Sequence, residues 1–301
     1  MHYLIEPAAI GDADITVPGD KSVSHRAVML GSIAEGVTGV SGFLAGEDCL
    51  ATMDAFQNLG VTIERPGSTE LVIHGVGLHG LQSPECELDL GNSGTAMRLM
   101  AGVLAGQDFS ATLTGDESLT GRPMQRIITP LREMGAAIES RDGKPPLRIK
   151  GNPALQAIDY TLPMASAQVK SAILLAGLYA QGRTTVIEPA VTRDHTERML
   201  RAMGVAVSSH DGRIGVEGPA TLRACPVRVP PDLPSAALVI LAALLAETAD
   251  VLLRDVAVTP TRTGVLDILL AMGGAITREN RRDMGAEPVA DLRVRSSKLQ
   301  G

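Results

Sequence analysis

Apolar residues recur at helical spacing in four similar stretches of the chain, and each stretch ends at a glycine. The glycines are Gly60, Gly135, Gly204 and Gly273, so the gaps between them are 75, 69 and 69 residues. Small and β-branched residues alternate after each glycine, which is typical of a helix end that leads into a strand. The chain therefore contains a sequence repeat with this period.

Every copy of the repeat predicts the same order of elements. The helices that end at the glycines are DCLATMDAFQNL, MQRIITPLREM, HTERMLRAM and VLDILLAM. A strand pair follows, ending in TELVIHG, PLRIKG, RIGVEG and LRVRS. An earlier helix begins after a small polar loop, in GDKSVSHRAVMLGSIAEG, LGNSGTAMRLMAGVLAGQ, MASAQVKSAILLAGLYAQG and DLPSAALVILAALLAETA. Each copy is thus strand–helix–strand–helix–strand–strand, which predicts an α/β (α+β) fold of repeated βαβαββ units.

A second, shorter similarity indicates where the domains divide. The segment ITVPGD, residues 15–20, resembles VRVPPD, residues 227–232. Both read as short strands that end at proline, and such bends suit a chain that crosses between domains. Three repeats lie between them, so we expect one domain at 20–229. Residues 1–19 and 230–301 would form a partial second domain with the fourth repeat.

Composition and charge narrow the functional classes. Apolar residues make up 45% and charged residues 20%, as in a globular protein, and the formal net charge of −7 gives no general attraction to nucleic acid or anionic membranes. Aromatic residues make up only 2%, which disfavours binding by stacking. Three distant cysteines without metal-type spacing predict reduced thiols in a cytoplasmic protein. The longest apolar run, residues 236–246, is too short to span a bilayer and predicts a buried helix.

Candidate chemistry gathers at the start of the earlier helices, where backbone N–H groups and the helix dipole favour anions. The first opening carries Lys21, Ser22 and Arg26, and the two cations are close enough in helical phase to face one ligand. It is not a P-loop, because Asp20 separates the glycine from the lysine. A solvated helix start capped by Ser22 or Asp20 remains the alternative.

Three further segments offer similar groups. In LGNSGTAMR the residue Gly94 would let backbone amides approach a ligand, although an ordinary turn also fits. Arg122 precedes a proline that would fix its position, although it could be a surface arginine. Ser166 is a natural N-cap, and Gln168 could offer its amide. Because three openings are equivalent in successive repeats, they predict a small polyanionic ligand held among helix N-termini.

These motifs closely resemble the 5-enolpyruvylshikimate-3-phosphate synthase family of enolpyruvyl transferases. The matching segments are PGDKSVSHRAVMLGSIAEG, LDLGNSGTAMRLMAGVLAGQ, GDESLTGRPMQRIITPLREMGA, PMASAQVKSAILLAGLYAQG and TRDHTERMLRAMG, in the family order. The resemblance implies two domains of three βαβαββ units each. It implies transfer of the enolpyruvyl group of phosphoenolpyruvate to the 5-hydroxyl of shikimate 3-phosphate, with release of phosphate. This reaction belongs to the shikimate pathway of aromatic amino acid biosynthesis and needs no metal or organic cofactor.

The resemblance also implies roles for individual residues. Lys21 contacts both substrates and is the candidate catalytic residue. Shikimate 3-phosphate is bound by Lys21, Ser22, Arg26, Ser166, Gln168 and Arg193. Phosphoenolpyruvate is bound by Lys21, Gly94, Arg122 and Gln168. For Arg193 a capped surface turn remains the alternative. The resemblance further implies a monomer that binds no nucleic acid and no membrane.

Three other interpretations stay open. The family's catalytic carboxylate and several phosphoenolpyruvate-binding cations lie in later units than the fourth, so an inactive ligand-binding fragment is one alternative. UDP-N-acetylglucosamine enolpyruvyl transferase is another, but that family has Lys-Asn in place of Lys21-Ser22 and a reactive cysteine before the Arg-Pro pair. Here residues 117–120 contain no cysteine. A nucleic-acid-modifying relative is disfavoured by charge and by the few aromatic residues.

Overall fold

The structure is a computed structural model that describes residue 4 and residues 9–301. The described chain forms two compact units, each built from the repeat. Lys21–Arg228 forms the first, here called the three-repeat unit. The described residues up to Asp20 and the segment Val229–Gly301 form the second, here called the one-repeat unit.

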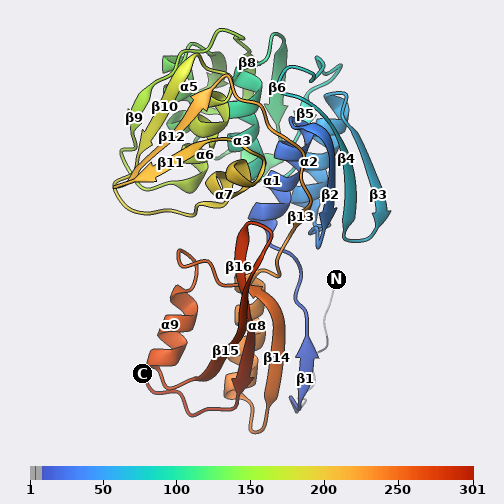
Figure 1. The fold of residues 1–301 in the computed structure, drawn as a ribbon, viewed down its shortest axis with the longest axis vertical. Helices are drawn as coiled ribbons and strands as arrows, with labels where there is room; N and C mark the ends of the chain where they lie inside the picture. The colour runs from blue at the N-terminus through green and yellow to red at the C-terminus, as the bar shows by residue number, and fades with distance from the viewer. Residues whose placement is uncertain (1–3, 5–8) are drawn as a thin grey trace. The chain divides into compact units, whose positions relative to one another are not determined.

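The three-repeat unit follows the predicted element order, with one extra short helix, α4 (Figure 1). The first repeat has α1 (Lys21–Ser32), β2 (Glu35–Ser41), α2 (Glu47–Asn58), β3 (Thr62–Gly67) and β4 (Glu70–Val76). The second has β5 (Leu88–Asp89), α3 (Gly94–Ala105), β6 (Ser110–Thr114), α4 (Glu117–Thr120), α5 (Gln125–Glu133), β7 (Ala137–Arg141) and β8 (Lys144–Lys150). The third has β9 (Asp159–Thr161), α6 (Ala167–Gly177), β10 (Gly182–Ile187), α7 (His195–Ala202), β11 (Val207–His210) and β12 (Arg213–Gly218), followed by β13 (Val227–Arg228).

The one-repeat unit contains a fourth copy of the same order. It has β1 (Ala13–Ile15), α8 (Leu233–Leu245), β14 (Asp250–Ala257), α9 (Gly264–Ala271), β15 (Ala275–Met284) and β16 (Glu287–Arg295). Each of the four sheets in the described chain has four strands in equivalent order, namely β13-β2-β4-β3, β5-β6-β8-β7, β9-β10-β12-β11 and β1-β14-β16-β15. In every sheet the first two strands are parallel and the rest are antiparallel. The predicted fold class is confirmed.

The first strands of two sheets are exchanged along the chain. β1 precedes α1 in sequence, yet it pairs with β14 of the fourth repeat. β13 precedes α8, yet it pairs with β2 of the first repeat. From the similarity of residues 15–20 to residues 227–232, the sequence analysis placed residues 1–19 with the fourth repeat and ended the first domain at residue 229. The pairing partner of each strand comes from the structure, because any short apolar strand can satisfy the same ladder.

The repeat glycines end their helices in left-handed backbone. Their φ angles are +88° for Gly60, +101° for Gly135, +86° for Gly204 and +88° for Gly273. In each case the next residue donates its N–H to a carbonyl five residues earlier, as Val61 does to Phe56 at 3.1 Å. This is the Schellman arrangement, which satisfies the free carbonyl groups of the last helical turn. The sequence prediction of four helix ends is confirmed.

The core of the three-repeat unit lies around α1, α3 and α6. These helices are buried along most of their length, and Figure 1 shows them enclosed by the three sheets. Close backbone approach explains one of their glycines, because a Cβ on Gly102 of α3 would lie 2.2 Å from the Ala172 carbonyl oxygen of α6. Small residues therefore let the central helices pack backbone to backbone.

The helix predicted from the apolar run 236–246 is only half buried. One face of α8 packs on β14 and β16 through residues such as Ile240 and Leu244. The other face leaves Leu238 at 75% and Leu245 at 64% exposure. The prediction of a fully buried helix is therefore wrong for the described residues. An all-apolar sequence gives no indication of which face is covered. Among the described residues no helix has both the length and the apolar character needed to cross a membrane.

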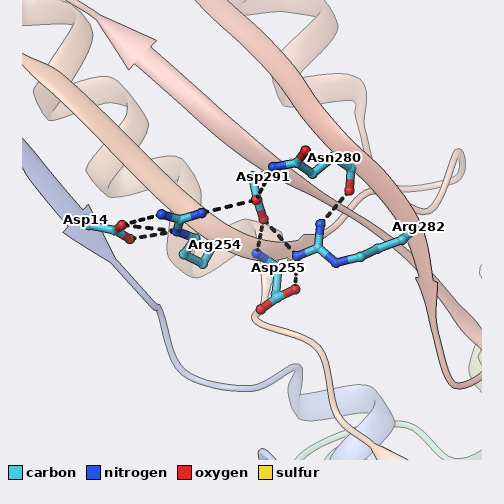
Figure 2. Close-up of polar contacts among 6 residues, drawn as sticks. All are labelled: Asp14, Arg254, Asp255, Asn280, Arg282 and Asp291. Carbon is cyan, nitrogen blue, oxygen red and sulfur yellow. Dashed lines mark hydrogen bonds and ion pairs between the residues drawn. The ribbon is translucent and has the colours of Figure 1, made fainter.

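A buried carboxylate organises the outer face of the sheet in the one-repeat unit (Figure 2). Asp291 accepts hydrogen bonds from the Asp255 N–H at 3.0 Å, the Asn280 amide at 3.0 Å and the Arg282 guanidinium at 2.9 Å. Pairing between strands shifts register beside Asp255 and Asn280, and both adopt positive φ. Burial raises the pKa of Asp291, but these donors outweigh burial and lower the pKa to about 2. The ionised carboxylate thus fixes two β-bulges.

Candidate active site

The opening of α1 places a lysine beside a carboxylate. Lys21 is the first residue of α1, and its ammonium forms an ion pair with Asp48 in the first turn of α2. The Lys21 side chain is half exposed, so it can reach a ligand as well as Asp48. Ser22 is partly buried in the same turn. The ion pair positions the lysine without removing it from solvent, as a cation that binds incoming anions requires.

Arg26 lies one turn further along α1 and is nearly buried, at 4% exposure. Its Nε donates to Thr196 Oγ1 at 2.7 Å, and Nη2 donates to Ser171 Oγ at 2.9 Å. Nη1 donates to the Ser22 carbonyl oxygen at 2.9 Å. The sequence analysis expected Lys21 and Arg26 to face one ligand together. In the structure the partners of Arg26 lie on α6 and α7 instead. Arg26 therefore fixes the opening of α1 to the third repeat.

The opening of α3 is surrounded by arginines. Ser93 caps the helix by accepting a hydrogen bond from Ala96 N–H at 3.1 Å. A Cβ on Gly94 would lie 2.8 Å from Arg98 Nη1 and 3.1 Å from Arg122 Nη1. Arg122 donates to the Asn92 side-chain oxygen and, at 3.3 Å, to Ser118 Oγ. Glycine at position 94 therefore leaves room for two guanidinium groups, which a larger residue would displace.

Arg98 was not singled out by the sequence analysis. It donates to the Gly94 carbonyl oxygen at 3.1 Å and to Gln168 Oε1 at 2.8 Å. Burial, followed by repulsion from Arg122 and Arg126, lowers the pKa of Arg98 from its ordinary value. An accumulation of like charge that lowers a pKa in this way indicates a place where an anion would be stabilised. Its position four residues after Gly94 was visible in the sequence, but most helical arginines are solvated.

The opening of α6 completes the cluster. Ser166 is the N-cap and accepts a hydrogen bond from Val169 N–H at 3.4 Å. Gln168 accepts from Arg98 and donates through Nε2 to Thr95 Oγ1 at 2.9 Å, so its amide orientation is fixed by two residues of α3. These contacts bring the second and third repeats together at their helix N-termini.

The last predicted residue, Arg193, is exposed and lies just before α7. Close to it in sequence, Glu188 accepts a hydrogen bond from the Thr192 hydroxyl. Glu188 also forms an ion pair with the buried Lys170 at 3.0 Å, and Glu197 lies 2.6 Å from the same ammonium group. The ion pairs of the buried lysine with these two glutamates hold α6 against the loop that precedes α7. The structure places Arg193 at the end of that loop.

The three-repeat unit therefore connects several of the predicted residues, mostly through residues that the sequence analysis did not select. Arg26 connects α1 to α6 and α7, while Arg98 and Gln168 connect α3 to α6. Sequence reasoning missed Asp48, Asn92, Thr95, Arg98, Ser171 and Thr196. Each of them carries a common polar side chain with an ordinary role elsewhere, so only the approach of distant segments shows its position.

The fold and the site define a protein of βαβαββ repeats in which basic side chains gather at helix N-termini. The chain belongs to the EPSP synthase (3-phosphoshikimate 1-carboxyvinyltransferase) family, whose model matches residues 6–301. This confirms the resemblance found in the sequence.

Individual relatives support the same assignment. The 3-phosphoshikimate 1-carboxyvinyltransferase of Hydrogenovibrio crunogenus is 56% identical over 307 residues, which cover 100% of this chain and 69% of that enzyme. The enzyme of the same name from Alkalilimnicola ehrlichii is 55% identical, with coverage of 100% and 68%. A solved structure of EPSP synthase from Acinetobacter baumannii matches with a TM-score of 0.92 and 52% identity, over 98% of this chain and 67% of that one.

Proposed function

We propose that the protein transfers the enolpyruvyl group of phosphoenolpyruvate to the 5-hydroxyl of shikimate 3-phosphate and releases phosphate. The observation that carries this proposal is the contact between the openings of α3 and α6, where Arg98 holds Gln168 and Arg122 lies beside Gly94. The opening of α1 adds the ammonium group of Lys21. Both proposed substrates are anions, so a cluster of cations and helix N-termini is the chemistry that would hold them.

The proposed roles of individual residues are those that the resemblance to the family implies. Shikimate 3-phosphate is bound by Lys21, Ser22, Arg26, Ser166, Gln168 and Arg193. Phosphoenolpyruvate is bound by Lys21, Gly94, Arg122 and Gln168. Lys21 serves both ligands because its half-exposed ammonium stands at the start of α1. Arg98 orients Gln168 and adds positive potential beside Gly94.

The reaction depends on charge that develops on the leaving group. The 5-hydroxyl oxygen bonds to C2 of phosphoenolpyruvate and loses its proton, while C3 gains a proton. The tetrahedral intermediate then loses a proton from C3 as the bond between C2 and the phosphate oxygen breaks. Lys21 and the arginines stabilise the negative charge that moves onto phosphate, and preorganised cations of this kind supply a large share of enzymatic acceleration.

Binding of shikimate 3-phosphate to the 301-residue chain tests the proposed site. We expect titration calorimetry to detect binding, and we expect Lys21→Met to weaken it by about tenfold or more, because a charge-assisted contact contributes about 1.5–3 kcal/mol. Lys150→Met, which removes an exposed lysine at the end of β8, is the matched control and should bind normally. No heat and no thermal shift with the unaltered chain would refute the proposal.

The resemblance also supports a monomeric, cytoplasmic protein, which we include in the proposal. Light scattering at several protein concentrations checks the oligomeric state. A mass that rises to twice the 31.4 kDa of the chain would contradict the monomer.

A further inference from the structure

Three fully buried polar side chains connect the first three helices of the three-repeat unit. His25 of α1 is 0% exposed, as is Thr52 of α2, and Ser93 before α3 is 1% exposed. The imidazole Nδ1 lies 2.8 Å from Thr52 Oγ1, and Nε2 lies 3.3 Å from Ser93 Oγ. One histidine therefore contacts the second turn of α2 and the residue that caps α3, and none of the proposed substrate contacts uses it.

The protons in these contacts can be assigned by their donors and acceptors. The Thr52 hydroxyl has a single proton, which it donates to the Asp48 carbonyl oxygen at 3.1 Å. Thr52 must then accept from His25, so Nδ1 carries the imidazole proton. Nε2 is left as an acceptor, and the Ser93 hydroxyl donates to it while accepting from Ala96 N–H at 3.1 Å. Every group in this arrangement has a partner.

The other neutral tautomer satisfies fewer groups. With the proton on Nε2, Ser93 Oγ would accept from both His25 and Ala96, and no other described contact would take the Ser93 proton. Thr52 would have to turn its proton toward Nδ1 and give up the Asp48 carbonyl. Unsatisfied groups are costly when they are buried, so the first arrangement is favoured.

We propose that His25 is a positioning residue, held as the neutral Nδ1–H tautomer, that fixes the openings of α2 and α3 relative to α1 through Thr52 and Ser93. Both ends of this relay adjoin the candidate active site. Asp48, whose carbonyl accepts from Thr52, holds Lys21 with its carboxylate. Ser93 caps α3 immediately before Gly94. The relay thus sets the distance between the lysine and the arginine-lined opening.

The hydrogen-bonded relay stands on the contacts alone, while its importance for catalysis rests on the proposed function. The two ideas fail in different experiments. Calorimetry with shikimate 3-phosphate tests the proposed binding site and release of phosphate from the two substrates tests the proposed transfer, whereas nuclear magnetic resonance of the unliganded chain decides the relay.

The first test reads the tautomer directly. Chain labelled with ¹⁵N-histidine is measured from pH 6 to 8, and the His25 signals are assigned by their loss in His25→Gln. We expect a protonated-type shift for Nδ1 and an unprotonated-type shift for Nε2. A protonated Nε2, or averaged shifts that show tautomer exchange, would overturn the proposal without any ligand.

The second test compares His25→Gln, which preserves the contact with Ser93, and His25→Asn, which preserves the contact with Thr52. Glutamine places its amide oxygen near Nε2 and can still accept from Ser93, whereas asparagine places its amide nitrogen near Nδ1 and can only donate to Thr52. We expect the Ala96 amide to exchange hydrogen within about threefold of the wild-type rate in His25→Gln. In His25→Asn we expect exchange at least about tenfold faster, because the capping serine loses its acceptor.

A control separates positioning from general loosening. Ser24→Ala removes another buried hydrogen bond of α1, the one from Leu44 N–H to Ser24 Oγ at 3.0 Å, without touching the relay. It should leave Ala96 exchange unchanged. If Ala96 exchange is accelerated equally in all three variants, His25 does not position α3. The same conclusion follows if neither histidine variant accelerates it.

Discussion

At the scale of single residues, the cationic side chains of the candidate site are held by the protein before any ligand arrives. Lys21 pairs with Asp48, Arg26 donates to α6 and α7, and Arg98 holds Gln168. Fixed groups lose little conformational freedom when an anion binds, so the binding energy is not used to order them.

The position of Gly94 gives a first residue-scale prediction. Gly94→Ala would place a methyl group 2.8 Å from Arg98 Nη1 and 3.1 Å from Arg122 Nη1. Both are ends of flexible side chains, so the fold should survive while the guanidinium groups move. We expect unchanged thermal unfolding and weaker binding of phosphoenolpyruvate, measured in the presence of shikimate 3-phosphate. Unchanged affinity would contradict the placement of the site.

The buried ion cluster gives a second prediction. Lys170 is 1% exposed between Glu188 and Glu197, so Lys170→Met leaves two buried carboxylates without their cation. We expect a loss of about 3 kcal/mol in the free energy of unfolding, because breaking a buried pair costs more than the pair contributed. Denaturant titration measures it. The triple change Lys170→Met, Glu188→Gln and Glu197→Gln should recover part of the loss, and an equally unstable triple variant would argue against this explanation.

At the scale of elements, the feature that all four repeats share is a helix that ends at a glycine. Four glycines in left-handed backbone stop four helices and turn the chain into strands. The sequence could predict these helix ends because they depend only on a local property, namely which residue tolerates positive φ. The bulges fixed by Asp291 were not readable, because they involve Asp255 and Asn280 at positive φ and a carboxylate on another strand.

Gly204 provides the cleanest test of these helix ends. Its φ is +86°, yet a Cβ there would meet nothing within 4 Å. Gly204→Ala should therefore cost only the conformational strain of an L residue in left-handed backbone, about 1–2 kcal/mol in the free energy of unfolding. Gly39→Ala is the control, since that site is equally open and its φ is not left-handed. Equal effects of the two changes would refute the argument.

At the scale of the whole molecule, the two chain segments that connect the units are hydrogen-bonded to each other. Asp20 N–H donates to the Pro230 carbonyl oxygen at 2.8 Å, and Asp232 N–H donates to that of Pro18 at 2.9 Å. Arg262 then bridges the two carboxylates, at 2.7 Å from Asp20 and 3.0 Å from Asp232. One guanidinium thus compensates two acidic groups.

This arrangement predicts a pH dependence of stability. Burial, with a further contribution from Asp20, raises the pKa of Asp232 to about 6. A carboxyl whose pKa is higher in the folded state binds more protons there, so its contribution to stability is present below pH 4 and is lost as the pH rises to 6. We expect a loss of about 1–2 kcal/mol, reduced by partial exposure to solvent.

Asp232→Asn is the matched variant, because asparagine can also cap α8. The free energy of unfolding, measured at pH 4 and at pH 6.5, should fall less in this variant than in the unaltered chain. The same fall in both proteins would show that Asp232 does not titrate in this range.

Features that depend on local chemistry were predictable from the sequence alone. The period of the apolar positions and the repeat glycines were sufficient for the order of the elements in four copies, apart from the short helix α4. The polar groups at helix starts were sufficient to select Lys21, Gly94, Arg122 and Gln168, because helix N-termini favour anions wherever they occur.

The contacts between distant segments came from the tertiary structure. It paired β1 with β14 and β13 with β2 strand by strand, and it placed Arg98 against Gln168 and His25 between Thr52 and Ser93. The physical reason is that pairing across long separations depends on packing and on the satisfaction of buried polar groups. Neither is recorded in the identity of neighbouring residues, so the sequence could indicate the groups of the site but not the contacts that hold them.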